Sequence, residues 1–175
     1  MKTLLLMRHA TADRGWPSFD DFNRPLSAEG QREAKGIGQH LKSYGPTPDR
    51  IFCSQARRAR ETWESLALET AQNRIDYQES LYSASPASLL NLIREVDAKD
   101  PTDCLMIIAH NPTIEVMIGG LVGTGSDETA LQRARAEVAP ASLAVLEFEG
   151  SSWSRLNPAE GRLVAFLGPA FLARG

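Results

Sequence analysis

The chain has 175 residues and a formal net charge of -3 at pH 7, which fits a single domain over residues 1–175 with a sizeable core. This charge disfavours a general nucleic-acid binder, which usually carries a basic excess. The first apolar run, Leu4 to Met7, is too short for a secretory signal or a membrane span. Cys53 and Cys104 lie in apolar runs without metal-ligand spacing. We therefore expect a cytoplasmic protein with buried thiols and no membrane contact.

The first apolar run predicts a strand that is buried on both faces of a parallel sheet. It leads directly into Arg8 and His9. Ligands of open α/β sheets bind at the carboxyl ends of the strands, so this pair is a candidate site. The polar stretch from Thr11 to Arg24 predicts a loop that is long enough to fold over the end of the strand, and such loops are often functional.

The next segment predicts a helix, a strand and a second helix. The first helix is expected to be capped by Ser27 and to end at Gly45. Arg50 to Cys53 predicts the second strand, and Ser54 is expected to cap a helix that runs to about Leu68. The first turns of this helix carry three arginines, namely Arg57, Arg58 and Arg60. Arg58 lies about 130° from the mean direction of the apolar positions, so it can point away from the helix's packing face.

Another strand and helix follow this helix. Arg74 to Gln78 predicts a strand, and Glu79 follows its end. Ser85 and Pro86 predict the start of a helix that reaches Val96. The chain therefore continues to alternate strands with helices.

A second histidine also follows a predicted strand. Cys104 to Ala109 is a fully apolar run that ends in His110. Asn111 and Pro112 are expected to open the next helix as its cap and its first-turn proline. Two of the three histidines of the chain thus stand at strand ends.

The C-terminal third is less regular than the rest of the chain. Residues 123–140 predict a mobile loop region with a short helix-capable stretch from Ala130 to Ala136. Ser142 to Phe148 and Leu163 to Leu167 predict strands that form a hairpin-like or edge pair. The alternation of strands and helices predicts an α/β three-layer sandwich, with a mostly parallel central sheet and helices on both faces.

Parallel strands would bring Arg8, His9, Arg58 and His110 to one edge of the sheet, and the sequence shows no acidic cluster to neutralise them. Two arginines and two histidines suit a compact dianion such as phosphate. Asn111, at the N-terminus of its helix, would add donors for the same ligand. His9 is the candidate nucleophile because a neutral imidazole can accept a phosphoryl group.

Competing chemistries lack their sequence motifs. The chain has no phosphate-binding nucleotide loop, no dinucleotide-binding glycine motif and no zinc-protease motif. His9, Asp13 and His110 could be imagined as metal ligands, but the nearby arginines would oppose a divalent cation. We therefore expect neither a metal nor a cofactor.

These residues resemble the histidine phosphatase superfamily, which includes the phosphoglycerate mutases. The resemblance is carried by the residues Arg8, His9, Arg58 and His110. The segments from Asp21 to Gly30 and from Ala109 to Pro112 look more narrowly like the SixA-type phosphohistidine phosphatases. The resemblance spans about residues 1 to 148 and implies a phosphoglycerate mutase-like fold.

The resemblance also implies roles for individual residues. His9 would be the phosphorylated residue, with Arg8, Arg58 and His110 as phosphate ligands and no metal required. Alignment of the motif favours Arg58 as the ligand, with Arg57 as the alternative.

Two positions raise questions within this resemblance. Glu79 stands where superfamily members that act on alcohol esters often have a general acid, and it is equally compatible with a solvated loop residue. Ala10 stands where the superfamily usually has glycine, so the backbone there must avoid conformations that only glycine tolerates.

The resemblance implies a phosphatase that acts on a protein-borne phosphohistidine or on a small phosphorylated molecule, through a phosphohistidine on His9. A general small-molecule phosphomonoesterase is the main alternative. A mutase is disfavoured, because it must keep its phosphoryl group from water. A non-catalytic domain that binds phosphorylated ligands is a further alternative.

Overall fold

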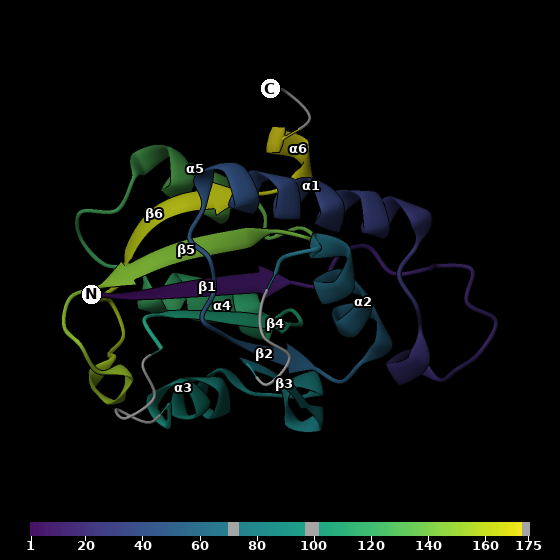
Figure 1. Cartoon of the computed structure of the whole chain (residues 1–175), viewed down its shortest axis with the longest axis horizontal. Coiled ribbons are helices and arrows are strands. Elements are labelled where there is room, and N and C mark those ends of the chain that lie inside the picture. Colours follow the sequence, from purple (N-terminus) through teal and green to yellow (C-terminus); the bar gives the residue numbers. More distant parts are fainter. Residues whose placement is uncertain (70–73, 97–101, 173–175) are drawn as a thin grey trace.

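The computed structural model describes residues 1–69, 74–96 and 102–172, and within them it contains a six-stranded sheet in the order β3-β2-β4-β1-β5-β6. The strands are β1 (Lys2–Arg8), β2 (Arg50–Ser54), β3 (Ile75–Gln78), β4 (Cys104–Ala109), β5 (Leu143–Phe148) and β6 (Arg162–Leu167). Neighbouring strands from β3 to β1 are parallel, whereas β5 is antiparallel to both β1 and β6 (Figure 1). The mostly parallel sheet is confirmed.

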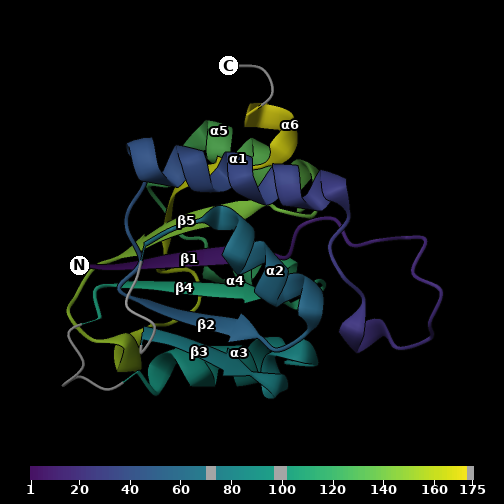
Figure 2. The same ribbon diagram turned by 45° about the vertical axis from the view of Figure 1, so that its right-hand side comes forward.

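Helices cover both faces of the sheet. They are α1 (Ala28–Tyr44), α2 (Arg57–Leu66), α3 (Pro86–Arg94), α4 (Thr113–Leu121), α5 (Glu128–Ala136) and α6 (Pro169–Leu172), with short 3-10 helices η1 (Asp21–Asn23), η3 (Glu79–Tyr82) and η4 (Trp153–Arg155). In Figure 2, α1 and α2 lie in front of the sheet and α4 lies behind it. The three-layer sandwich is therefore confirmed.

Each face of the sheet has its own hydrophobic core. Leu4 and Leu6 of β1 belong to the cluster that includes α3, α4 and α5. Leu5 and Met7 belong to the cluster that includes α1 and α2. Successive side chains of a strand point to opposite faces, so a strand between two helical layers needs an unbroken apolar run.

Helix caps were predicted correctly at α1 and α3 but wrongly at α2 and α4. The Ser27 and Ser85 hydroxyls each accept a hydrogen bond from a backbone N–H in the first turn of their helix. Ser54, in contrast, is the last residue of β2, and α2 begins after Ala56 without a side-chain cap. Asn111 is not a cap either, because α4 follows Pro112. The Ser54 and Asn111 side chains make other hydrogen bonds, which are described below.

Within residues 123–140, which were predicted as a loop region with a helix-capable stretch from Ala130 to Ala136, that stretch is helical: α5 begins two residues earlier, at Glu128, and occupies half of the segment. The Asp127 carboxylate caps it by accepting from Ala130 N at 2.8 Å. Ala130 is buried, and the Arg133 guanidinium lies 4.5 Å from the centre of the Phe171 ring. The apolar positions are too few to give a clear helical period, and α5 is fixed by packing against β6 instead.

Cys53 and Cys104 are buried on neighbouring strands, β2 and β4. Burial raises the pKa of the Cys104 thiol to about 12 and raises that of Cys53 as well. Both are therefore unreactive thiols, as expected from their apolar surroundings. No helix in the described ranges is long and apolar enough to cross a membrane.

Candidate active site

A cavity of about 320 Å³ opens at the carboxyl ends of β1 and β4. It is lined by Arg8, His9, Thr11, Ala12, Arg14, Arg24, Arg58, His110, Asn111 and Pro140. Because β1 and β4 are parallel neighbours and β2 lies beside β4, the three strands deliver their following residues to one edge of the sheet (Figure 1). The structure thus brings together four residues that lie up to about a hundred positions apart.

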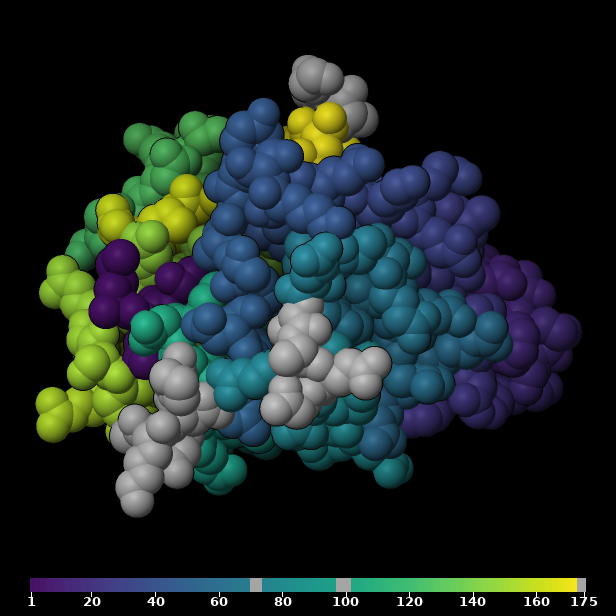
Figure 3. Space-filling model, in the orientation of Figure 1, coloured from purple at the N-terminus to yellow at the C-terminus, as the bar shows by residue number. Residues whose placement is uncertain are grey.

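The loop after β1 forms one end of the molecule, where it is coloured purple in Figure 3. Its base is held firmly. Thr11 donates from its backbone N–H and its hydroxyl to the Glu33 carboxylate, at 2.9 Å each. Leu26 N donates to Glu61 Oε2 at 2.7 Å, and Leu26 also forms an isolated antiparallel β-bridge with Ala12. Both ends of the loop are therefore attached to helices beside the cavity.

His9 is held as a neutral imidazole whose Nε2 lone pair faces Arg58. Its Nδ1 lies 2.7 Å from Ala10 O, which can only accept, so Nδ1 carries the proton. Nε2 accepts from Arg58 Nε at 3.2 Å. Burial lowers the pKa of His9 to about 4, and the positive charges of Arg58 and Arg8 add to this effect. Nε2 therefore carries the lone pair of the ring at neutral pH.

Ala10 fits without strain where the superfamily usually has glycine. It is not among the non-glycine residues with a positive φ. Its backbone N–H donates to Thr62 Oγ1 at 3.0 Å, and that hydroxyl donates to Arg58 O at 2.7 Å. Thr62 thus joins the backbone after the nucleophile to α2.

Arg58, and not Arg57, reaches the cavity from α2. The Arg58 side chain is 7% exposed, and its NH2 lies 3.4 Å from His110 Nδ1. Arg57 points elsewhere, with its Nε 2.6 Å from Glu61 Oε1 and a side chain that is 42% exposed. The arginine that faces His9 is therefore Arg58.

His110 is fixed by a serine at the end of the neighbouring strand. Its Nε2 lies 2.8 Å from Ser54 Oγ, which explains why Ser54 does not cap α2. The His9 and His110 rings have centres 5.0 Å apart. Burial, together with the electrostatic influence of the neighbouring His9 and Arg58, lowers the pKa of His110 to about 3. His110 is therefore neutral in this arrangement.

Arg8 and Asn111 share one backbone acceptor at the cavity wall. Arg8 NH1 and Asn111 Nδ2 donate to Val138 O at 2.9 and 3.2 Å, respectively. Asn111 Nδ2 also donates to Glu115 Oε2 at 3.1 Å, which takes the side chain away from a capping position. Arg8 Nε is buried and has no hydrogen-bond partner among the described residues. Arg8 thus keeps donors that a phosphate could use.

The sequence did not predict the acid that lies beside these cations. The Asp21 carboxylate accepts from Arg58 NH2 at 3.1 Å and from Tyr82 OH at 2.7 Å, and it lies 2.9 Å from Arg24 NH2. The hydrogen bond from Tyr82 holds the pKa of Asp21 below its ordinary value, and Arg58 and Arg24 contribute. The Tyr82 ring stands edge-on to His110, with centres 5.5 Å apart. In the sequence, Asp21 stood out only as part of the long loop after β1 and as the first residue of the SixA-like segment, and neither signal placed it against Arg58.

Glu79 lies outside this group. It is exposed at the start of η3 and is not among the residues that line the cavity. The same short helix ends with Tyr82, whose ring reaches His110. The structure therefore brings Tyr82, and not Glu79, to the other site residues.

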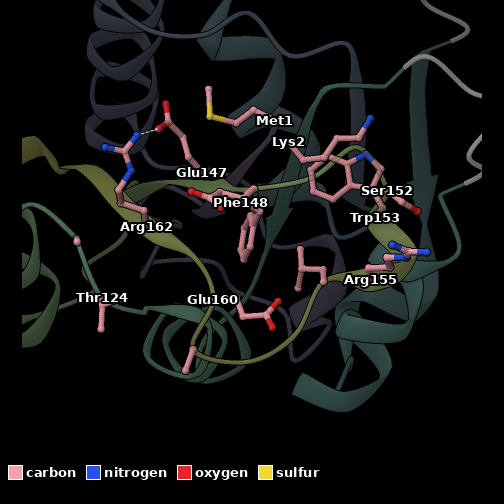
Figure 4. Close-up of a pocket in the computed structure, with 14 residues that line it drawn as sticks. Met1, Lys2, Thr124, Glu147, Phe148, Ser152, Trp153, Arg155, Glu160 and Arg162 are labelled. Atoms are coloured by element: carbon pink, nitrogen blue, oxygen red, sulfur yellow. Dashed lines mark hydrogen bonds and ion pairs between the residues drawn. The ribbon is translucent and has the colours of Figure 1, made fainter.

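A larger cavity of about 690 Å³ lies at the opposite end of the sheet, beside the start of β1 (Figure 4). Two of its cations are already paired with carboxylates: Lys2 pairs with Asp103, and Arg162 pairs with Glu147. No histidine or cysteine lines it. The smaller cavity is the one that holds the two strand-end histidines and the arginines beside them, so it is the candidate active site.

Sequence and structure comparisons agree with this geometry. Residues 4–82 match the model of the histidine phosphatase superfamily (branch 1). An uncharacterized protein of Mycobacterium leprae is 34% identical over 163 residues, which cover 91% of this chain and 98% of that protein.

Two solved structures have a similar fold. A candidate phosphohistidine phosphatase SixA from Nakamurella multipartitia is 28% identical and has a TM-score of 0.77, with 96% of each chain covered. Another candidate SixA, from Agrobacterium tumefaciens, is 27% identical and has a TM-score of 0.74, with 96% of this chain and 99% of that chain covered.

A buried histidine among arginines at the carboxyl edge of a phosphoglycerate mutase-like sheet defines the class of protein, and this chain belongs to the histidine phosphatase superfamily. Within that superfamily its fold and its sequence resemble the SixA-type branch. Membership supports phosphatase activity.

Proposed function

We propose that the protein is a metal-independent phosphatase that hydrolyses phosphohistidine borne by a protein, through a covalent phosphohistidine intermediate on His9. The observation that carries this proposal is the state of the His9 ring. Its Nδ1–H donates to Ala10 O, and its Nε2 lone pair faces Arg58 in the arginine-lined cavity. A neutral imidazole with a directed lone pair is a competent phosphoryl acceptor.

The reaction has two steps. In the first, His9 Nε2 forms a bond to phosphorus while the bond from phosphorus to the leaving nitrogen breaks, and the leaving imidazole takes up a proton from solvent. In the second, a water oxygen forms a bond to the phosphorus of phosphorylated His9 while the bond from phosphorus to Nε2 breaks, the water gives its proton back to solvent, and inorganic phosphate is released. His9 then returns to its neutral form.

The cationic groups stabilise the phosphoryl group during both steps. Arg8 and Arg58 provide N–H donors in a mostly buried site, where charge-assisted hydrogen bonds are strong. His110 lies beside His9 and is held by Ser54. The two arginines do for the developing charge what a metal ion does in other phosphatases.

The neighbours named as candidate SixA proteins support phosphohistidine as the substrate. The position of Glu79 also supports it, because no glutamate lines the cavity to protonate an alkoxide. An imidazole is a better leaving group than an alkoxide and depends less on such an acid.

The test is a comparison of turnover on a phosphohistidine protein, p-nitrophenyl phosphate and a panel of sugar phosphates. We expect kcat/KM for the phosphohistidine protein to exceed the others by about a hundredfold, which is about 2.7 kcal/mol of transition-state discrimination. A comparable preference for a sugar phosphate would identify a small-molecule phosphomonoesterase instead. Turnover should persist in excess chelator, and a loss that a divalent cation restores would overturn the metal-independent mechanism.

A further inference from the structure

The nucleophilic lone pair of His9 is already an acceptor in this structure. Arg58 Nε donates to His9 Nε2 at 3.2 Å. An imidazole nitrogen has one lone pair in the ring plane, so Nε2 cannot accept this hydrogen bond and form a bond to phosphorus at the same time. Arg58 Nε must therefore leave Nε2 when a phosphoryl group is attacked.

The two terminal nitrogens of the Arg58 guanidinium both donate to Asp21. NH1 donates to Asp21 O at 2.7 Å, and NH2 donates to Asp21 Oδ2 at 3.1 Å. NH2 also lies 3.4 Å from His110 Nδ1. Four contacts thus engage a group that has five N–H donors, and two of the four come from Asp21.

We propose that Asp21 is a built-in anionic competitor for Arg58, which a phosphoryl dianion must displace, so that this carboxylate sets the affinity of the site for phosphate. The inference deepens the proposed function, because it concerns the same phosphate site. A carboxylate and a phosphate oxygen bind a guanidinium in the same geometry. The dianion carries more charge than the carboxylate, and this favours the exchange.

Asp21 can give up Arg58 without being left alone. Its Oδ1 lies 2.9 Å from Arg24 NH2, and its Oδ2 accepts from Tyr82 OH at 2.7 Å. The carboxylate side chain is 47% exposed, so water can replace the lost partner. An ion pair with one half-exposed partner is weak enough to exchange readily.

Replacement of Asp21 by phosphate on Arg58 would move only the middle of the loop that follows β1. Thr11 and Leu26 anchor its ends to α1 and α2. Between them, Trp16 is partly exposed and donates from Nε1 to Asp20 O at 3.3 Å. Trp16 is thus a spectroscopic reporter in the same loop, hydrogen-bonded to the residue that precedes Asp21.

The test is the binding of inorganic phosphate to Asp21→Asn by isothermal titration calorimetry. Asparagine keeps the acceptor oxygen but removes the charge, so we expect the Kd for phosphate to fall about three- to tenfold. Glu147→Gln is the matched control, since it removes a carboxylate from an arginine pair at the opposite end of the sheet, and its Kd should equal that of the wild type. An unchanged or higher Kd in Asp21→Asn would overturn the inference.

Trp16 fluorescence supplies a second measurement that needs no folded Asp21 variant. Titration of the wild type with phosphate should change the emission, and the change should vanish in Trp16→Phe, which keeps the buried Trp63 and Trp153. Phosphate binding without any Trp16 response would contradict displacement of Asp21. Turnover on phosphorylated substrates is measured separately. If no substrate is hydrolysed while Asp21→Asn still binds phosphate more tightly, the proposed function fails and the competition stands.

Discussion

The Ser54 hydroxyl lies 2.8 Å from His110 Nε2, and so the end of β2 holds the histidine that follows β4. Ser54 is fully buried and His110 is 9% exposed, so water cannot readily replace this contact. A side chain that the sequence marked as a helix cap is therefore a positioning residue of the site.

Ser54→Ala tests this role. The change leaves His110 Nε2 unpaired and its ring less constrained, so we expect the free energy of unfolding to fall by about 1–3 kcal/mol. We also expect kcat to fall about tenfold, which corresponds to about 1.4 kcal/mol of transition-state stabilisation. Steady-state kinetics and urea denaturation measure the two effects. A stability loss with an unchanged kcat would reduce Ser54 to a purely structural role.

His9→Ala is expected to abolish turnover and phosphoenzyme formation while the fold persists, because no other group offers a directed imidazole lone pair at this position. Labelling with a radioactive phosphorylated substrate, quenched in alkali because the P–N bond of phosphohistidine is acid-labile, measures the intermediate, and circular dichroism checks the fold. His40→Ala is the control and should retain turnover, because His40 is a half-buried residue of α1 that does not line the cavity. Acid-labile phosphate on another residue would refute the assignment of His9.

Arg58→Ala and Arg57→Ala form a matched pair on neighbouring residues of α2. Arg58 faces His9, so its loss should lower kcat/KM about 10²- to 10³-fold, as expected for a donor to a charged transition state. Arg57 is paired with Glu61 and partly exposed, so its loss should change kcat/KM by less than about threefold. Equal losses in the two variants would show that the helix, and not the guanidinium of Arg58, is responsible.

The depressed pKa of His9 predicts an unusual titration. Because burial lowers it to about 4, the ring should remain in its neutral Nδ1–H form as the pH falls from 7 to 5. Two-dimensional ¹⁵N NMR of the imidazole nitrogens measures both the tautomer and the midpoint, and His9→Ala identifies the signal. A midpoint near the ordinary value of about 6.5 would contradict the desolvated environment.

The same shift affects stability. Unfolded His9 binds a proton below about pH 6.5, whereas folded His9 binds it only near pH 4. The unfolded state therefore holds more protons between these values, and the free energy of unfolding should decrease as the pH falls through this window. His110, with a pKa of about 3, adds to the decrease. Urea denaturation at pH 7 and pH 5 should show a smaller loss in His9→Ala than in the wild type.

Glu79→Gln tests whether Glu79, which is exposed and outside the cavity, is a general acid or a solvated loop residue. If it is a solvated residue, turnover of phosphohistidine should stay within about threefold of the wild type, whereas loss of a general acid costs about 10²-fold or more. The comparison is made on phosphohistidine and on an alcohol ester with the same protein preparation. We expect no large loss on phosphohistidine, and a loss of about 10²-fold on it would make Glu79 catalytic.

Sequence reasoning worked best where one local pattern fixes the outcome. The apolar runs before His9 and His110 predicted buried strands, and these placed both histidines at one edge of the sheet. It failed where a side chain had two possible uses. Ser54 is a suitable helix cap and also a hydrogen-bond partner for His110, and only the tertiary contact decides between them. Asp21 could not be located, because its partner Arg58 is far away in the chain and the loop has no period.

Gly30 shows what the SixA-like segment from Asp21 to Gly30 contributes to the structure. A Cβ at this position would lie 2.1 Å from Thr11 O, so only glycine lets α1 approach the backbone that follows the nucleophile. Leu26, in the same stretch, is anchored by Glu61. Neither residue is a ligand of the phosphate site proposed here. A relative that had lost His9 would keep the same need for this close approach, so the stretch identifies the scaffold, whereas hydrolytic competence must be judged from the histidines and arginines.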